Sequence, residues 1–286
     1  MPKVSAARPK RKKPKLGQHF LVDRAAALRI VESSGDLSQS TVLEIGPGRG
    51  ALTSLLAKRA RRLIAIELDR VLAAQLRMHF SLATNVEIIE ADILAVDLDT
   101  IFGPKPGSTR PGLNHQPERV SVVGNLPYFL TSEILLRLFA YRKYFSTLVL
   151  MVQNEVAERL AAQPGKADYG LLSATAQLYA HVRKLFTLPP GAFSPPPKVD
   201  SAVVELRMAS QLESLRVPES AFLSFLKLSF AQKRKTLWNN LKSEYPSQGL
   251  RDAMQRVGIE PTSRAEAVPL EKAAALFRTL GSTRAS

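Results

Sequence analysis

Short apolar runs alternate with segments of helical period over the first two-thirds of the chain. The apolar runs lie at 41–46, 62–68, 86–92, 120–125 and 146–153. Segments in which apolar residues recur every three or four positions follow four of these runs, at 51–60, 69–82, 131–142 and 154–162. Runs of this length are typical of buried strands. Their alternation with helices predicts a mostly parallel, doubly wound α/β sheet.

The pattern changes toward the C-terminus. Two strand-like runs, 182–188 and 201–208, are separated only by the proline-rich 189–200, which predicts an antiparallel hairpin at the edge of the sheet. After residue 208 the strands stop, and helical period returns at 218–242, 249–258 and 269–281. We therefore expect an α/β domain over 16–208 and a small all-helical C-terminal domain over 209–286.

Two segments fit neither pattern. Residues 103–118 are rich in glycine and proline, which predicts a surface insertion within the α/β domain. Residues 1–15 carry seven basic side chains and no acidic one. We expect this tail to be disordered until it binds a partner.

Positive charge is concentrated at the two ends of the chain. There are 40 Lys and Arg against 25 Asp and Glu, a net charge of +15, of which 1–15 supply +7 and 207–286 supply +6. A near-neutral middle with basic flanks indicates a catalytic core with appendages that bind a polyanion such as RNA. A tail that only aids solubility, or that contacts a membrane surface, is the alternative.

Composition also narrows the chemistry. The absence of cysteine excludes disulfides, thiolate metal sites and a cysteine nucleophile, and it is compatible with a cytoplasmic protein. The four histidines are scattered without metal-ligand spacing, so we expect no metal site. No apolar run reaches the ~18 residues that a membrane span needs. We expect a monomer with no membrane partner.

A glycine-rich loop follows the first predicted strand. Gly46, Gly48 and Gly50 permit a tight turn and a close approach of the backbone to a ligand. Glu67 ends the second strand, where a carboxylate can accept hydrogen bonds from both ribose hydroxyls, and Asp92 ends the third, where it can bond an adenine amine. Because ligands of open α/β sheets bind at the carboxyl ends of strands, these residues predict a nucleoside site.

The spacing of the glycines favours one cofactor. It is G-x-G-x-G rather than the G-x-G-x-x-G of dinucleotide folds, and no Lys-Ser/Thr pair follows, which argues against ATP or GTP in a P-loop. S-adenosylmethionine (SAM) contains adenosine without phosphate, and its sulfonium is positive. It therefore suits a loop beside acidic residues, and NAD is the second possibility.

An amide, a proline and an aromatic ring follow the fourth predicted strand, in NLPY at 125–128. A simple turn would explain them, because Asn and Pro are common turn residues. NLPY also resembles the [N/D]-P-P-Y signature of methyltransferases that act on exocyclic amines. Three further motifs narrow the resemblance to the KsgA/RsmA family, the small-subunit rRNA adenine dimethyltransferases. They are KLGQHFL at 15–21, AFSPPPKVDSAVV at 192–204 and SFAQKRKTLWNNL at 229–241.

The resemblance covers roughly residues 15–280 and implies a Rossmann-like SAM-dependent methyltransferase fold. The related macrolide-resistance methyltransferases of large-subunit rRNA share the first motifs but match AQKRKTLWNNL less well. The basic tail, the insertion at 103–118 and His19, where the family often has Asn, depart from the family pattern. The cofactor contacts that the resemblance implies are His19, Leu21, Gly46, Glu67, Asp92 and Asn125.

A role for NLPY follows from the chemistry of adenine. The N6 amine is a poor nucleophile because its lone pair is delocalised into the ring, and two acceptors near its N–H groups favour a pyramidal nitrogen. We assign these acceptors to the side-chain carbonyl of Asn125 and the backbone carbonyl of Leu126, with Pro127 fixing the backbone. Tyr128 offers a face for stacking. Phe193, by its place in the family, stacks on the other face, or else is an ordinary packed aromatic.

We therefore expect SAM-dependent dimethylation of the N6 amines of two adjacent adenosines in the 3′-terminal hairpin of small-subunit (16S) rRNA, within an immature ribosomal subunit. A large-subunit rRNA or DNA adenine methyltransferase is one alternative, and a mainly non-catalytic ribosome-assembly factor is another. In the helical domain we expect Lys233, Arg234 and Lys235 to bind RNA. Their alternative is a solvated basic surface.

Overall fold

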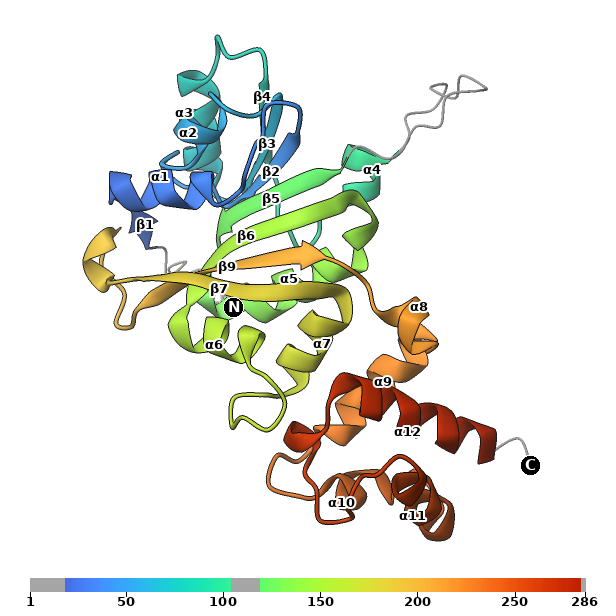
Figure 1. The fold of residues 1–286 in the computed structure, drawn as a ribbon. Coiled ribbons are helices and arrows are strands. Elements are labelled where there is room, and N and C mark those ends of the chain that lie inside the picture. Colours follow the sequence, from blue (N-terminus) through green and yellow to red (C-terminus); the bar gives the residue numbers. More distant parts are fainter. Residues whose placement is uncertain (1–18, 104–118, 284–286) are drawn as a thin grey trace, which may run out of the picture.

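Seven of the described strands form a central sheet. The computed structural model describes residues 19–103 and 119–283, so the predicted tail at 1–15 and all of the predicted insertion except Gly103 lie outside the described residues. In spatial order the strands are β4 (Val86–Glu90), β3 (Arg62–Glu67), β2 (Thr41–Ile45), β5 (Val120–Asn125), β6 (Phe145–Gln153), β9 (Ser201–Met208) and β7 (Ala180–Leu188). The first five are parallel, and β9 runs antiparallel to both its neighbours. This mixed sheet confirms the predicted Rossmann-like α/β fold (Figure 1).

Helices cover both faces of the sheet. On one face α5 (Thr131–Ala140), α6 (Asn154–Ala161) and α7 (Leu171–Tyr179) pack through a large apolar cluster. On the other, α1 (Arg24–Glu32) and α2 (Thr53–Leu56) pack through a second cluster. Successive strand residues alternate between the two, so that Leu148 belongs to the first cluster and Val149 to the second. Burial on both faces explains why these strands are continuous apolar runs in the sequence.

The antiparallel pair lies where it was predicted, but it is not a simple hairpin at the edge. β9 is inserted between β6 and β7, so of these two antiparallel strands only β7 lies at an edge of the sheet. The connection between β7 and β9 contains β8 (Phe193–Ser194), which pairs with β1 (Phe20–Leu21) in a separate two-stranded sheet. This small sheet holds the start of the described chain beside the sheet's carboxyl edge.

Local signals and the folded chain agree in part. Asp69, the first residue of the helical segment predicted at 69–82, caps α3 (Arg70–His79) by accepting from the N–H groups of Val71 and Leu72. The helix predicted over 51–60 is shorter, because only α2 is helical there. The side chain of Asn85 donates to the carbonyls of Ala57 and Ala60, at 2.9 and 3.0 Å, and so stabilises the turns in which the segment ends. The sequence pattern did not predict α1 and α7.

The chain after β9 is helical, as predicted. Its helices are α8 (Leu212–Leu215), α9 (Glu219–Ser229), α10 (Leu237–Leu241), α11 (Ser247–Arg256) and α12 (Leu270–Thr283). Their apolar residues join the large cluster beneath α7, and Tyr169, 2% exposed, packs edge-on against Phe230. Arg142 also forms an ion pair with Glu219 across this boundary, at 2.7 Å. The division into domains at 208 stays a prediction.

Candidate active site

A cavity opens at the carboxyl ends of β2, β3 and β5. It encloses about 860 Å³, its open mouth included. Its walls are His19, Phe20, Ile45, Gly46, Gly48, Ile66, Glu67, Leu68, Ala91, Asp92, Ile93, Asn125, Leu126, Pro127, Tyr128, Phe129, Leu130 and Ile134. Eight of the residues predicted for the cofactor or for catalysis therefore line one cavity. The parallel strands bring them together, because residues far apart in sequence end at the same edge.

The backbone of the glycine loop favours glycine at two positions. Gly46 and Gly48 have φ angles of +65° and +57°, in the left-handed region that side chains disfavour. A Cβ on Gly48 would also lie 3.0 Å from the ring of Phe20. Phe20 thus packs directly on the loop, and the guanidinium of Arg49 lies 4.5 Å from the centroid of the same ring. The β1 segment forms a wall of the cavity in this way.

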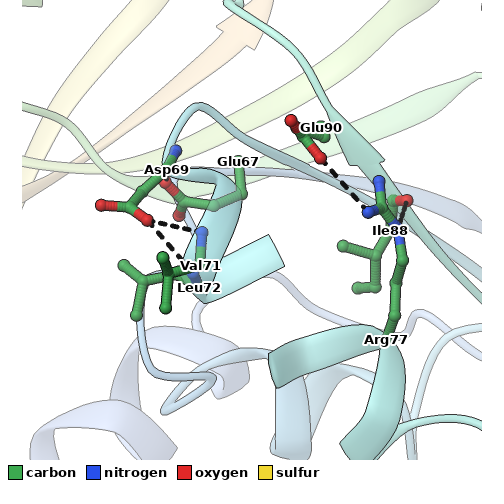
Figure 2. A network of polar contacts seen from close by, with 7 residues as sticks. All are labelled: Glu67, Asp69, Val71, Leu72, Arg77, Ile88 and Glu90. Carbon is green, nitrogen blue, oxygen red and sulfur yellow. Dashed lines mark hydrogen bonds and ion pairs between the residues drawn. The ribbon is translucent and has the colours of Figure 1, made fainter. Parts of the chain in front are cut away.

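Glu67 is the most rigidly held acid in the cavity. It is only 3% exposed, and its two oxygens accept from the backbone N–H groups of Gly48 and Asp69, both at 2.9 Å. Figure 2 shows Glu67 beside Asp69, whose own carboxylate caps α3 through Val71 and Leu72. Each carboxylate oxygen of Glu67 keeps a lone pair for a further donor, so the pair can receive two ribose hydroxyls.

Asp92 lies two residues beyond the end of β4 and lines the same cavity. One of its oxygens accepts from the N–H of Leu94 at 2.8 Å, an arrangement that fixes the carboxylate over the turn that follows the strand. The prediction that Asp92 ends the strand was therefore too long by two residues, but its position at the cavity wall agrees with the sequence analysis.

The amide of Asn125 is held in one orientation. Its Nδ2 donates to the backbone carbonyl of His19 at 2.9 Å. A carbonyl can only accept, so the NH₂ of the amide must point to His19, and the side-chain carbonyl is left as the acceptor. This contact gives His19 a role that the sequence did not predict.

Tyr128 is held from two sides. Its ring stacks on that of His19 with centroids 5.7 Å apart and planes inclined by 27°. Its hydroxyl is 2.6 Å from Ser201 Oγ, and partial burial raises the pKa of Tyr128 above its usual range. The ring of His19 is in turn held by the carbonyl of Pro195, 2.8 Å from Nδ1. The phenol therefore stays neutral at physiological pH and acts as a fixed aromatic surface.

Two predicted site residues lie elsewhere. Leu21 and Phe193 face each other across the small β1–β8 sheet, 7% and 3% exposed, within the second apolar cluster. Leu21 reaches only a smaller pocket behind the glycine loop. Phe193 does not line the cavity, because its ring is buried against the core. Its stacking on a base stays a prediction, and it requires the ring to leave this cluster.

The predicted RNA contacts lie in the turn between α9 and α10, away from the cavity. Lys233, Arg234 and Lys235 are all exposed, in a turn rather than a helix. The Nζ of Lys233 donates to the carbonyl of Ala167 at 3.0 Å, so this lysine also ties the helical region to the loop before α7.

Several cavity residues were missed by the sequence analysis. Phe20, Leu68 and Phe129 line the cavity, and Leu68 and Phe129 remain 49% and 60% exposed. Phe20 lies inside the KLGQHFL motif, and Phe129 follows Tyr128 directly, so their neighbourhood was the available signal. Large apolar side chains at an open mouth suit the flat faces of adenine rings.

The cavity fits SAM better than a phosphorylated nucleotide. Its described walls contain the carboxylates of Glu67 and Asp92 but neither lysine nor arginine. A positive sulfonium is favoured in such surroundings and a pyrophosphate is disfavoured, which argues against NAD. Within the described ranges no group of three or more His, Cys, Asp or Glu side chains could hold a metal ion.

Comparisons with known proteins identify the family. The sequence profile of the family "Ribosomal RNA adenine dimethylase" matches residues 9–281. The chain is 57% identical over 282 residues to "Ribosomal RNA small subunit methyltransferase A" of Koribacter versatilis, covering 98% of this chain and 99% of the relative. It is 42% identical over 271 residues to the protein of that name from Geobacter metallireducens, covering 93% and 94%.

Solved structures agree on the fold. The 23S rRNA methyltransferase ErmE superposes with a TM-score of 0.68 at 29% identity, covering 92% of this chain and 99% of that one. A dimethyladenosine transferase from Plasmodium falciparum superposes with a TM-score of 0.76 at 24% identity, covering 92% and 98%. With a family profile that matches nearly the whole chain and relatives of this identity, the chain belongs to the ribosomal RNA adenine dimethylase family.

Proposed function

We propose that this protein dimethylates the N6 amines of two adjacent adenosines in the 3′-terminal hairpin of small-subunit (16S) rRNA. Its family confirms the enzyme class and the methyl donor, SAM. The observation that carries the assignment of residues is the fixed amide of Asn125. Its NH₂ group is committed to His19, so its carbonyl is available to an amine in the cavity.

Two acceptors act on the substrate amine. The side-chain carbonyl of Asn125 and the backbone carbonyl of Leu126 accept from the two N–H groups and hold the nitrogen lone pair toward the methyl group. The N–H of Leu126 donates to the carbonyl of Met151 at 3.0 Å, which holds the peptide that precedes this carbonyl against β6. Pro127, with φ of −63°, restricts the backbone that follows.

Alignment supplies most of the catalysis. SAM contributes an electrophilic methyl group on a sulfonium that is already a good leaving group. The cavity walls hold the amine in line with it, and no side chain is needed as a general base, because the methylated ammonium loses its proton readily to water. Glu67 and Asp92 bind the ribose and the adenine of the cofactor.

Tyr128 receives the target base. An adenine inside an RNA fold must leave its stack before it reacts, and an aromatic surface lowers the cost of holding it outside. The contacts to His19 and Ser201 keep the ring of Tyr128 in place before the substrate arrives. Less ordering is then left to occur on binding.

The choice of the small subunit rests on the relatives. The proteins named for small-subunit rRNA are 57% and 42% identical, whereas the structure named for 23S rRNA is 29% identical.

We further propose a monomeric, cytoplasmic enzyme whose partner is an immature small ribosomal subunit. No helix among residues 19–103 and 119–283 has the length and apolar character to cross a membrane.

Nucleoside mass spectrometry tests this function. The purified protein is incubated with SAM and immature small subunits from a strain that lacks the methylations. We expect N6,N6-dimethyladenosine at two adjacent positions near the 3′ end. Modification confined to large-subunit RNA would favour the large-subunit alternative. Full rescue of a deletion strain by the Asn125→Ala variant would favour a non-catalytic assembly factor.

A further inference from the structure

The edge of the sheet formed by β9 and β7 carries a polar, basic surface that the proposed active site does not use. Register pairs His181 with Arg207 and Arg183 with Glu205, and side chains opposite each other point to the same face. Lys184, on the other face, forms an ion pair with Glu158 of α6. The four paired side chains therefore lie on the face opposite α6.

This part of the face is open, although the rest of it is covered. Farther along the same face, Val149, Met151 and Val203 are fully buried in the cluster beneath α1. Arg183 and Arg207, in contrast, have side chains that are 66% and 64% exposed. A sheet of this kind normally has both faces covered. The open part of this one carries guanidinium groups.

One buried carboxylate fixes two of these guanidinium groups. Glu205, with a side chain only 7% exposed, accepts from Arg183 through one oxygen and from Arg207 through the other. The Nε–carboxylate distances are 3.2 and 3.0 Å, and the Nη2 distances are both 3.0 Å. Each guanidinium thus uses one edge for Glu205. The edge that carries Nη1 is directed away from the carboxylate and can donate to a further acceptor.

A third guanidinium extends the surface along β7. Arg29 of α1 lies 3.8 Å from the ring centroid of Phe186, which shares the face of Arg183 one same-face position along the strand. Same-face positions on a strand are about 6.6 Å apart. Arg29, Arg183 and Arg207 therefore form a row. Against the single carboxylate of Glu205 the row keeps an excess of two positive charges.

We propose that the row Arg29–Arg183–Arg207 binds the phosphodiester backbone of the rRNA substrate. Arginine recognises phosphate with paired N–H donors, and a row of fixed guanidinium groups suits a ligand whose negative charge recurs along a chain. Glu205 orders Arg183 and Arg207 in advance, so less side-chain freedom is lost on binding. This inference rests on the proposed substrate and adds a surface that neither the family resemblance nor the NLPY motif identified.

The test measures RNA binding by a variant in which the charged cluster Arg183, Glu205 and Arg207 is neutralised. The variant R183Q/E205Q/R207Q removes both cations and the carboxylate between them, so no buried charge is left unpaired. Its matched control is R62Q/R77Q/E87Q, which removes two surface arginines and a carboxylate at the opposite edge of the sheet, where Arg62 pairs with Glu87 at 2.8 Å. Both variants change the net charge equally.

Fluorescence anisotropy is recorded over a range of salt with two probes, immature small subunits and a protein-free fragment that contains the 3′-terminal hairpin. We expect the cluster variant to bind both probes about five- to twenty-fold more weakly than the control. The salt dependence should also flatten by ~0.7–0.9 for each lost phosphate contact. Single-turnover methyl transfer at saturating RNA should equal that of the control. A third variant, E205Q, retains both arginines but loses the carboxylate that orders them, so its affinity should lie between those of the wild type and the cluster variant.

Three outcomes would overturn the proposal. Equal affinity and equal salt slope in the cluster variant and the control would make the cluster a plain surface ion network. Weaker binding to subunits alone, with normal binding to the RNA fragment, would assign the face to a ribosomal protein. Binding by E205Q as weak as that of the cluster variant would assign the effect to lost structure rather than to the guanidinium groups. None of these depends on catalysis, so a wild type that leaves the adenosines unmodified would refute the proposed function separately.

Discussion

The cofactor cavity and the turn between α9 and α10 are opposites in how they hold charge. In the cavity, Glu67 is 3% exposed and both its oxygens are bonded to backbone N–H groups. In the turn, Lys233, Arg234 and Lys235 are all exposed, and among the described contacts only Lys233 has a fixed acceptor, the carbonyl of Ala167. Hydrogen bonds to the backbone therefore hold the carboxylate of Glu67 in place, whereas the exposed side chains of the turn can change their conformation.

The difference teaches what each region can contribute. A reaction that depends on alignment requires atoms held within fractions of an ångström, and backbone hydrogen bonds supply this. Contacts to a phosphate backbone depend mainly on the number of charges and on salt. Substitutions in the cavity should therefore act through geometry and burial, with large effects. Substitutions in the turn should be milder and sensitive to salt.

The largest expected effect concerns a buried acid behind the glycine loop. Glu44 is 1% exposed, and its Oε2 has no hydrogen-bond partner among the described residues. Burial raises the pKa of Glu44 from 4.5 to about 8. The folded protein thus keeps a proton that the unfolded chain loses, and stability falls as pH rises from about 4.5 to 8. The shift sets an upper limit of roughly 5 kcal/mol.

Glu44→Gln should remove this loss. We expect the variant to match the wild type near pH 4.5 and to be several kcal/mol more stable at pH 8, measured by urea unfolding at each pH. Glu87→Gln, on the exposed part of β4, serves as the control and should not change the pH profile in this way. Parallel stability profiles for Glu44→Gln and the wild type would show that Glu44 is ionised in the fold.

Asn125→Ala should have the next largest effect. The substitution removes one of two acceptors at the reacting nitrogen, and loss of one such preorganised partner typically costs 10²–10³ in rate, or ~3–4 kcal/mol. Single-turnover methyl transfer with saturating SAM and RNA measures it. SAM should still bind, perceptibly more weakly. A rate within tenfold of the wild type would remove the proposed role of Asn125.

Glu67→Ala should weaken cofactor binding rather than the chemical step. Charge-assisted hydrogen bonds are worth ~1.5–3 kcal/mol, so the affinity for SAM should fall by roughly tenfold to a hundredfold. Calorimetry measures the affinity. Circular dichroism checks that the fold is intact, because the N–H groups of Gly48 and Asp69 lose their acceptor in this variant. Asp97→Ala, which removes an exposed carboxylate that caps α4 (Leu98–Phe102), is the control. Unchanged SAM affinity would place Glu67 outside the site.

Sequence reasoning succeeded where one residue type has one physical use. The left-handed φ angles of Gly46 and Gly48 and the position of Glu67 at a strand end followed from local chemistry and from the geometry of parallel strands. The link between His19 and Asn125 could not be foreseen, because it joins residues 106 positions apart through a backbone carbonyl. The insertion of β9 between β6 and β7 is likewise a matter of topology that strand period does not encode.

The role of Phe193 at the substrate stays a prediction. Phe193 lies in a motif that the family resemblance placed at the substrate, and pairing of β8 with β1 buries its ring in the core of this structure. The sequence analysis also overlooked Arg183 and Arg207. In the sequence they are single basic residues in two separate strands, and only the register around Glu205 brings them together.

The smallest expected effect separates the three residues of the turn between α9 and α10. Arg234→Ala/Lys235→Ala removes only exposed charge, so affinity for immature small subunits should fall about three- to tenfold, and the salt slope should flatten by up to ~0.7 per lost contact.

Lys233→Ala also removes the bond to Ala167, so it should lower the melting temperature slightly as well as weaken RNA binding. The triple variant should combine both effects. SAM affinity should not change in any of these variants, because none of the three residues lines the cavity. Wild-type RNA affinity and salt slope in the triple variant would make this turn a plain solvated surface. Rigid, buried charge would then remain the means of cofactor binding, and the adaptable contacts to RNA would have to come from the row on β9 and β7.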